Sequence, residues 1–134
     1  MPRQPRPKPT IPAPVEPPAT RRVLLVEPDQ MLASILKRRL AEAHAVTVDT
    51  VLTARRMQEQ MARRQYRLVL VDMSLNVVSL IPQITSQGAQ VVVTTPSASP
   101  ADVRELTAAG ADAVLITSQY TPDGVVTFLR KYLS

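Results

Sequence analysis

Five short apolar runs, separated by segments with helical periodicity, restrict this chain to few folds. The runs are Val23 to Val26, Ala45 to Val48, Leu68 to Val71, Val91 to Val93 and Ala113 to Ile116. Runs that are apolar on both faces are typical of parallel strands covered by helices on both sides. Because such crossovers are right-handed, the alternation favours a doubly wound α/β sheet with ligand sites at the carboxyl ends of its strands.

The segments between these runs carry helix signals. We expect helices from about Asp29 to Ala43, from Thr53 to Arg64, between Leu75 and Gln87, from Pro100 to Ala109, and from Thr121 to the C-terminus. The fourth is the clearest, since Ser99 can cap it, Pro100 fits its first turn and Gly110 follows its last. The predicted order is strand then helix, five times.

Length and composition narrow the class of protein further. A chain of 134 residues has room for one domain, and the absence of cysteine excludes disulfides, thiolate metal sites and a cysteine nucleophile. No apolar run approaches the ~20 residues of a membrane helix, and the N-terminus lacks the apolar stretch of a signal peptide. We therefore expect one cytoplasmic domain with no membrane partner.

The first 21 residues have a different composition from the rest. Eight of the 13 prolines lie in the first 18 residues, and residues 1–22 carry a net charge of +4 out of +5 for the whole chain. Such a segment cannot build a core and favours an extended, polyproline-like chain. We interpret residues 1–21 as a disordered basic arm that serves as a tether, with a docking peptide as the alternative, and residues 22–134 as the folded domain.

A cluster of basic residues could indicate that the chain binds nucleic acid. The arginines in and after the second helix are Arg55, Arg56, Arg63, Arg64 and Arg67. No aromatic residues for base stacking accompany them, so we favour a solvated face and expect no nucleic acid. The alternative is that the basic arm binds nucleic acid, with an affinity that would fall steeply as the salt concentration rises. His44 has no metal-ligating neighbours and is expected to face solvent.

Enzyme motifs are missing from the expected positions. With three glycines in all, the chain has no GxGxxG or GxxxxGK after the first strand to cradle nucleotide phosphates. It also has no GxSxG elbow of a hydrolase. We therefore expect that the chain is not an enzyme.

Acidic and hydroxyl residues follow the predicted strands. They are Glu27, Pro28 and Asp29 after the first, Asp72 after the third, Thr94 and Thr95 after the fourth, and Thr117 and Ser118 after the fifth. Close carboxylates at one edge of a sheet repel each other and attract a divalent cation. A simpler role for Asp72 is to cap the loop that follows its strand.

The runs VLLVEPD, LVLVDMS, VVVTTPS and AAGADAVLI, in that order, resemble a response-regulator receiver domain over residues 22–134. The resemblance implies a (βα)5 flavodoxin-like fold with a five-stranded parallel sheet in the order 2-1-3-4-5. In that family an aspartate after the third strand accepts a phosphoryl group from a histidine kinase, and two acids after the first strand hold Mg²⁺. Asp72 matches the phosphoacceptor and Glu27 matches the first acid.

Other positions depart from the family pattern. A Thr or Ser after the fourth strand and a Lys after the fifth normally bind the phosphoryl oxygens; Thr95 matches the former, and Thr117 stands in place of the Lys. Pro28 replaces the second acid, and Val114 stands where an aromatic switch residue often lies. MSLNVVSL after Asp72 replaces the usual turn elements, so that loop is expected to differ in shape.

These departures bear on phosphorylation, which depends on cations that neutralise the transferring oxygens. A metal would rely on Glu27, Asp29 and Asp72, so Mg²⁺ binding should be weak or absent. The resemblance then implies a stand-alone, degenerate receiver that binds a signalling protein, such as a histidine kinase or another regulator, or a second copy of itself, through its fourth helix, fifth strand and fifth helix. The alternative is a single-domain response regulator that a histidine kinase phosphorylates on Asp72.

Overall fold

The computed structural model describes residues 21–133, and the strands and helices alternate along them as predicted. The predicted arm lies, apart from Arg21, outside the described residues. The strands are β1 (Arg22–Val26), β2 (Thr47–Val51), β3 (Leu68–Asp72), β4 (Gln90–Thr95) and β5 (Ala113–Ile116). The α-helices are α1 (Gln30–His44), α2 (Ala54–Arg63), α3 (Val77–Thr85), α4 (Pro100–Ala109) and α5 (Pro122–Leu133).

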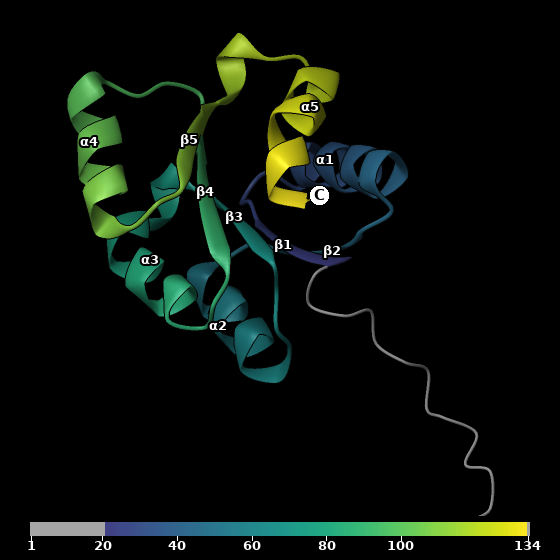
Figure 1. Cartoon of the computed structure of the whole chain (residues 1–134), viewed down its shortest axis with the longest axis horizontal. Coiled ribbons are helices and arrows are strands. Elements are labelled where there is room, and N and C mark those ends of the chain that lie inside the picture. Colours follow the sequence, from purple (N-terminus) through teal and green to yellow (C-terminus); the bar gives the residue numbers. More distant parts are fainter. Residues whose placement is uncertain (1–20, 134) are drawn as a thin grey trace, which may run out of the picture.

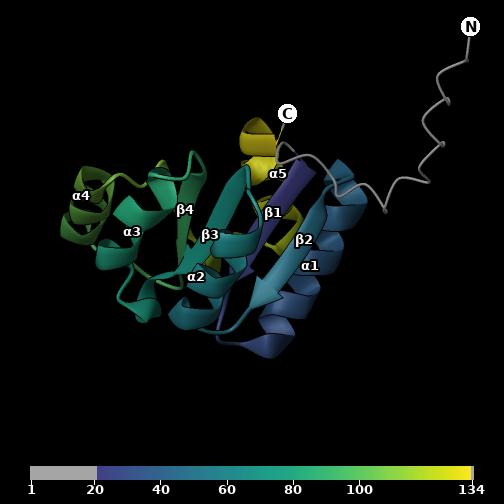
Figure 2. The same ribbon diagram turned by 90° about the horizontal axis from the view of Figure 1, so that it is seen from below.

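All five strands run parallel in one sheet, in the order β2-β1-β3-β4-β5. This confirms the doubly wound fold and the strand order that the resemblance implies. Helices α1 and α5 cover one face of the sheet, and α2, α3 and α4 cover the other (Figures 1 and 2). None of the helices in residues 21–133 is long and apolar enough to cross a membrane.

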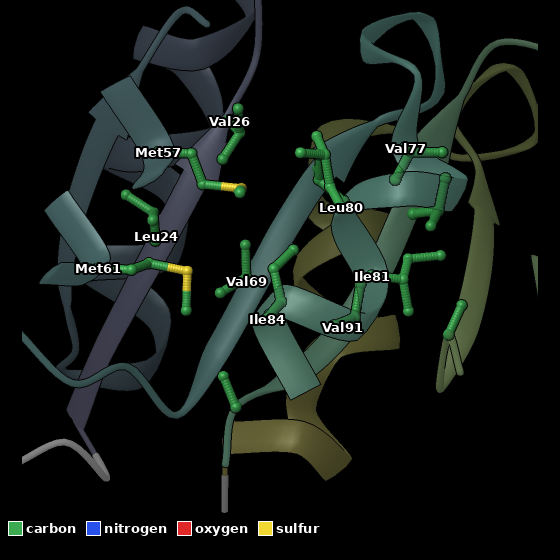
Figure 3. Close-up of a cluster of buried hydrophobic side chains, with 14 of the residues drawn as sticks. Leu24, Val26, Met57, Met61, Val69, Val77, Leu80, Ile81, Ile84 and Val91 are labelled. Carbon is green, nitrogen blue, oxygen red and sulfur yellow. The ribbon is translucent and has the colours of Figure 1, made fainter. Parts of the chain in front are cut away.

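The apolar runs form strands because both of their faces are buried. Along β1, Leu24 and Val26 point into the layer of α2, α3 and α4, where Met57 lies beside them and Ile81 belongs to the same cluster (Figure 3). The alternate residues of the same strand pack with α1 and α5 on the opposite face. Successive side chains of a strand point to opposite faces, so one continuous apolar run supplies both halves of the core.

Two sequence predictions near the end of α1 are wrong. The second strand begins at Thr47 instead of Ala45, because Ala45 adopts the left-handed conformation (φ 52°) and ends α1. His44 does not face solvent; it is half-buried, and its Nε2 lies 3.0 Å from the carbonyl oxygen of Val126 on α5. Its last-turn position on α1 directs the ring toward the neighbouring helix.

The three arginines of α2, Arg55, Arg56 and Arg63, are exposed as predicted, whereas the two arginines that follow the helix are not. Arg55 and Arg56 are exposed and both contact Glu59, at 3.4 and 3.0 Å. Arg64 and Arg67 are half-buried, because the connection to β3 packs against the sheet. Arg64 lies 3.5 Å from the carboxylate of Asp49, and Arg67 is bound to the end of α5.

Candidate functional site

The sheet brings the predicted site residues to its carboxyl edge. Asp72 is the last residue of β3 and pairs in register with Thr94 of β4. Thr95 ends β4 and pairs with Ile116 of β5. Glu27 follows β1, and its backbone N–H donates to the carbonyl oxygen of Val51 at 3.0 Å, which holds it at the same edge.

Glu27 and Asp72 form a carboxyl pair. Glu27 is almost fully buried, with 5% of its surface exposed. This burial, a side-chain hydrogen bond with Asp72 and the negative charge of Asp72 raise the pKa of Glu27 to about 7, against a smaller lowering by the backbone N–H of Asp29. Two close carboxyl groups cannot easily both ionise, so near neutral pH this pair holds a proton for much of the time.

Asp72 also caps the segment that follows it. One of its carboxylate oxygens accepts a hydrogen bond from the backbone N–H of Ser74 at 2.8 Å. The next residues form the 3-10 helix η2 (Met73–Leu75), and Asn76 adopts the left-handed conformation (φ 54°) before α3 begins. The capping role considered from the sequence is therefore present, together with the contact to Glu27.

The carboxylate of Asp29 binds the start of α1. Its Oδ1 accepts from the backbone N–H groups of Met31 and Leu32, at 3.0 and 3.1 Å, as an N-cap residue does. Of the three predicted metal ligands, Glu27 and Asp72 are thus brought together, and Asp29 is directed to the helix. Residues 21–133 contain no cluster of three or more His, Cys, Asp or Glu side chains that could hold a metal ion.

The hydroxyl residues bind the neighbouring main chain. Thr95, 3% exposed, donates from Oγ1 to the carbonyl oxygen of Ser97 at 2.7 Å. Thr117, in the 3-10 helix η3 (Thr117–Gln119), donates to the carbonyl oxygen of Thr95 at 3.3 Å, and Ser118 donates to that of Pro96 at 2.6 Å. These bonds join the loop after β4 to the loop after β5.

No lysine of the described segment lies at this edge. Lys37 is in the middle of α1, and Lys131 is in the last turn of α5, at the opposite edge of the sheet. The position after β5 carries Thr117, which supplies a hydrogen-bond donor without charge. The site therefore combines a proton-holding acidic pair with uncharged hydroxyl groups.

Two contacts of this network, at Ser97 and Ser118, were not predicted from the sequence. The carbonyl oxygen of Ser97 accepts from Thr95 within the loop after β4, and the hydroxyl of Ser118 donates to the carbonyl oxygen of Pro96, which joins this loop to the one after β5. The hydroxyl of Thr95 is itself a signal for a local side-chain turn, which could have indicated a bond to the backbone of Ser97 two positions on. The contact of Ser118 joins residues 22 positions apart and has no local signal.

The five parallel strands in the order 2-1-3-4-5 have the fold of CheY-like receiver domains. An orphan response regulator of H. pylori has a similar structure, with a TM-score of 0.79 and 21% identity over 88% of this chain and 100% of that chain. A CheY-like receiver domain protein from Methanospirillum hungatei has a TM-score of 0.74 and 22% identity, over 84% of this chain and 93% of that chain.

A third similar structure is that of an atypical orphan response regulator described as having a new phosphorylation-independent regulatory mechanism. Its TM-score is 0.74 at 21% identity, over 84% of this chain and 94% of that chain. No protein-family model matches this sequence, and no curated protein matches it. The structural likeness at these identities establishes the fold.

Proposed function

We propose that this chain is a degenerate receiver domain of two-component signalling that acts as a protein-interaction module without being phosphorylated. The observation that carries the proposal is Thr117, which stands after β5 where receivers have a lysine. Its hydroxyl donates to the carbonyl oxygen of Thr95. A phosphoryl group on Asp72 would find no cation there to balance its charge.

The acidic pair supports the same conclusion. Mg²⁺ binds to ionised carboxylates, so it must displace the proton that Glu27 and Asp72 hold between them. The burial that raises the pKa of Glu27 thus works against the metal near neutral pH. Pro28 offers no side-chain ligand, and Asp29 caps α1.

The proposed contact face consists of α4, β5 and α5, by resemblance to receivers. Its partner would be a signalling protein such as a histidine kinase or another regulator in the cytoplasm, or a second copy of this chain. Tyr120, 38% exposed, and the partly exposed Val114 supply apolar surface on this face. Without a phosphoryl group to shift its conformation, the domain would bind at a level set by partner concentration.

A phosphorylatable single-domain response regulator is the second candidate. One observation favours it: Glu27 and Asp72 lie close enough to hydrogen-bond, which is the placement that two acids need to share a Mg²⁺ ion. Asp72 would then accept the phosphoryl group from a histidine kinase, with Thr95 and Thr117 as hydrogen-bond donors to it.

A Mg²⁺ titration followed by amide NMR separates the two candidates. It should be made at about pH 8, above the pKa of Glu27, so that the bound proton does not mask an affinity. We expect no saturable change at the amides of Glu27 and Asp72 up to millimolar metal. The control variant is Asp49→Asn, at a half-buried aspartate of β2. A saturable change that is lost in Asp72→Asn but kept in Asp49→Asn would favour phosphorylation instead.

A further inference from the structure

Three of the four aromatic residues of this chain form one stripe along α5. Tyr120, just before the helix, meets Phe128 edge to face with ring centroids 5.6 Å apart, and Phe128 lies 6.3 Å from Tyr132. The ammonium group of Lys131 lies 5.5 and 5.2 Å from the last two rings. Tyr120 is 38% exposed, Phe128 is half-buried and Tyr132 is buried in the core, so the stripe reaches solvent at Tyr120 and Phe128.

The first described residues of the chain begin beside the other end of this stripe. Arg67 joins the two places: its backbone N–H donates to the carbonyl oxygen of Arg22 at 3.0 Å, and its Nε donates to that of Tyr132 at 2.6 Å. Figure 2 shows the start of β1 close to the end of α5. The 20 residues before Arg21 are therefore attached next to Tyr132.

Those 20 residues have the composition that aromatic surfaces recognise. Proline-rich segments in the polyproline conformation dock on aromatic-lined grooves, because their conformation is already restricted before binding. Residues 11–18, IPAPVEPP, contain four prolines and two branched apolar residues. Glu16 is the only acid in residues 1–20, and Arg130 and Lys131 lie in the last turn of α5, the end of that helix beside the start of β1.

We propose that residues 11–18 of the chain dock in cis on this stripe, at the accessible rings of Tyr120 and Phe128. A polyproline chain of 20 residues spans about 60 Å, at ~3.1 Å per residue. The ring centroids at the two ends of the stripe lie no more than about 12 Å apart, so about four residues of a polyproline chain cover it. The tether between residue 18 and β1 is short enough to bring the segment to the Tyr132 end first.

The attachment makes even a weak contact significant. A short flexible linker gives an effective concentration on the order of millimolar, so a docking contact with a Kd near 1 mM would be formed about half of the time. The docked segment would cover the α5 side of the proposed contact face. This inference concerns residues 11–18 and α5 alone, and it stands whether or not Asp72 is phosphorylated.

Paramagnetic relaxation enhancement on the full chain tests the proposal. Because the chain has no cysteine, Thr10→Cys accepts a single nitroxide label next to the docking segment. We expect a severalfold loss of amide intensity at Tyr120 and its neighbours, and none at Arg55 on α2, which covers the opposite face of the sheet. Tyr120→Ser should abolish the loss without threatening the fold, since this side chain is partly exposed, and Gln119→Ser should retain it.

Two outcomes would overturn the proposal. Uniform broadening, or broadening confined to the start of β1, would mean that the segment does not dock on α5. A mixture of spin-labelled chain with isotope-labelled chain that carries no nitroxide distinguishes the copies. Broadening of Tyr120 in that mixture would assign the stripe to the segment of a second copy, whereas its absence supports docking in cis.

Discussion

Glu27→Gln is expected to make the protein more stable than the parent at pH 8, by up to about 3 kcal/mol, and about equally stable at pH 5. The reason is the buried carboxyl group beside Asp72, whose pKa is raised from 4.5 to about 7. At pH 5 the parent holds the group protonated in the folded state, much as the neutral amide of Gln would be. At pH 8 the parent must bury a second negative charge.

The sign of this effect follows from proton binding. Between about pH 4.5 and 7 the folded chain binds more protons at Glu27 than the unfolded chain does, so rising pH lowers the free energy of unfolding. The stability that the raised pKa of Glu27 adds to the folded state is fully present below about pH 4.5 and is lost as the pH rises through about 7. Above that range the contribution of this group no longer changes.

Urea unfolding at pH 5, 6, 7 and 8 would measure the difference between the variant and its parent. Glu42→Gln, at an exposed position of α1, is the matched control and should follow the parent at every pH. Equal pH dependence in Glu27→Gln and the parent would mean that Glu27 titrates normally, and the proposed obstacle to Mg²⁺ would be absent.

Leu129→Ala is expected to destabilise the fold by about 2 to 5 kcal/mol. Leu129 is fully buried in α5 and belongs to the core cluster that joins this helix to α1 and the sheet. Removing its side chain takes away apolar burial and leaves a cavity between two layers that can close only in part. The loss should appear as a lower midpoint of urea unfolding.

Leu52→Ala provides the control for the same chemical change at the surface. Leu52 follows β2 and is 36% exposed, so its truncation should cost less than about 1 kcal/mol. Equal losses at the two positions would show that α5 is not anchored by the cluster around Leu129.

The fold could be predicted almost completely from the sequence, because its signals are local. Each run that is buried on both faces is a strand, and the bounds of α4 follow from the capping pair Ser99 and Asp102 and from Gly110 at its end. The error at β2 has a physical cause. Ala45 and Val46 look like the start of an apolar run, but an alanine in the left-handed conformation is a departure from propensity that no sequence pattern marks.

The site could be predicted in its residues but not in its contacts. The ends of the strands placed Glu27, Asp72, Thr95 and Thr117 at one edge, since parallel strands must end together. Which groups bind each other depends on the loops, where one carboxylate can cap a helix or face a neighbouring strand. Asp29 is the example: its sequence position allows both, and its two hydrogen bonds to the start of α1 decide between them.

The most direct test of the proposed function is incubation of the full chain with acetyl phosphate and Mg²⁺, followed by intact mass measurement. Asp72→Asn is the control, because it keeps the size of the side chain and removes the nucleophile. We expect no added phosphoryl mass in either protein, since Thr117 supplies no charge to the site. A phosphoryl mass on the parent chain that Asp72→Asn abolishes would contradict a phosphorylation-independent module and establish Asp72 as a phosphoacceptor.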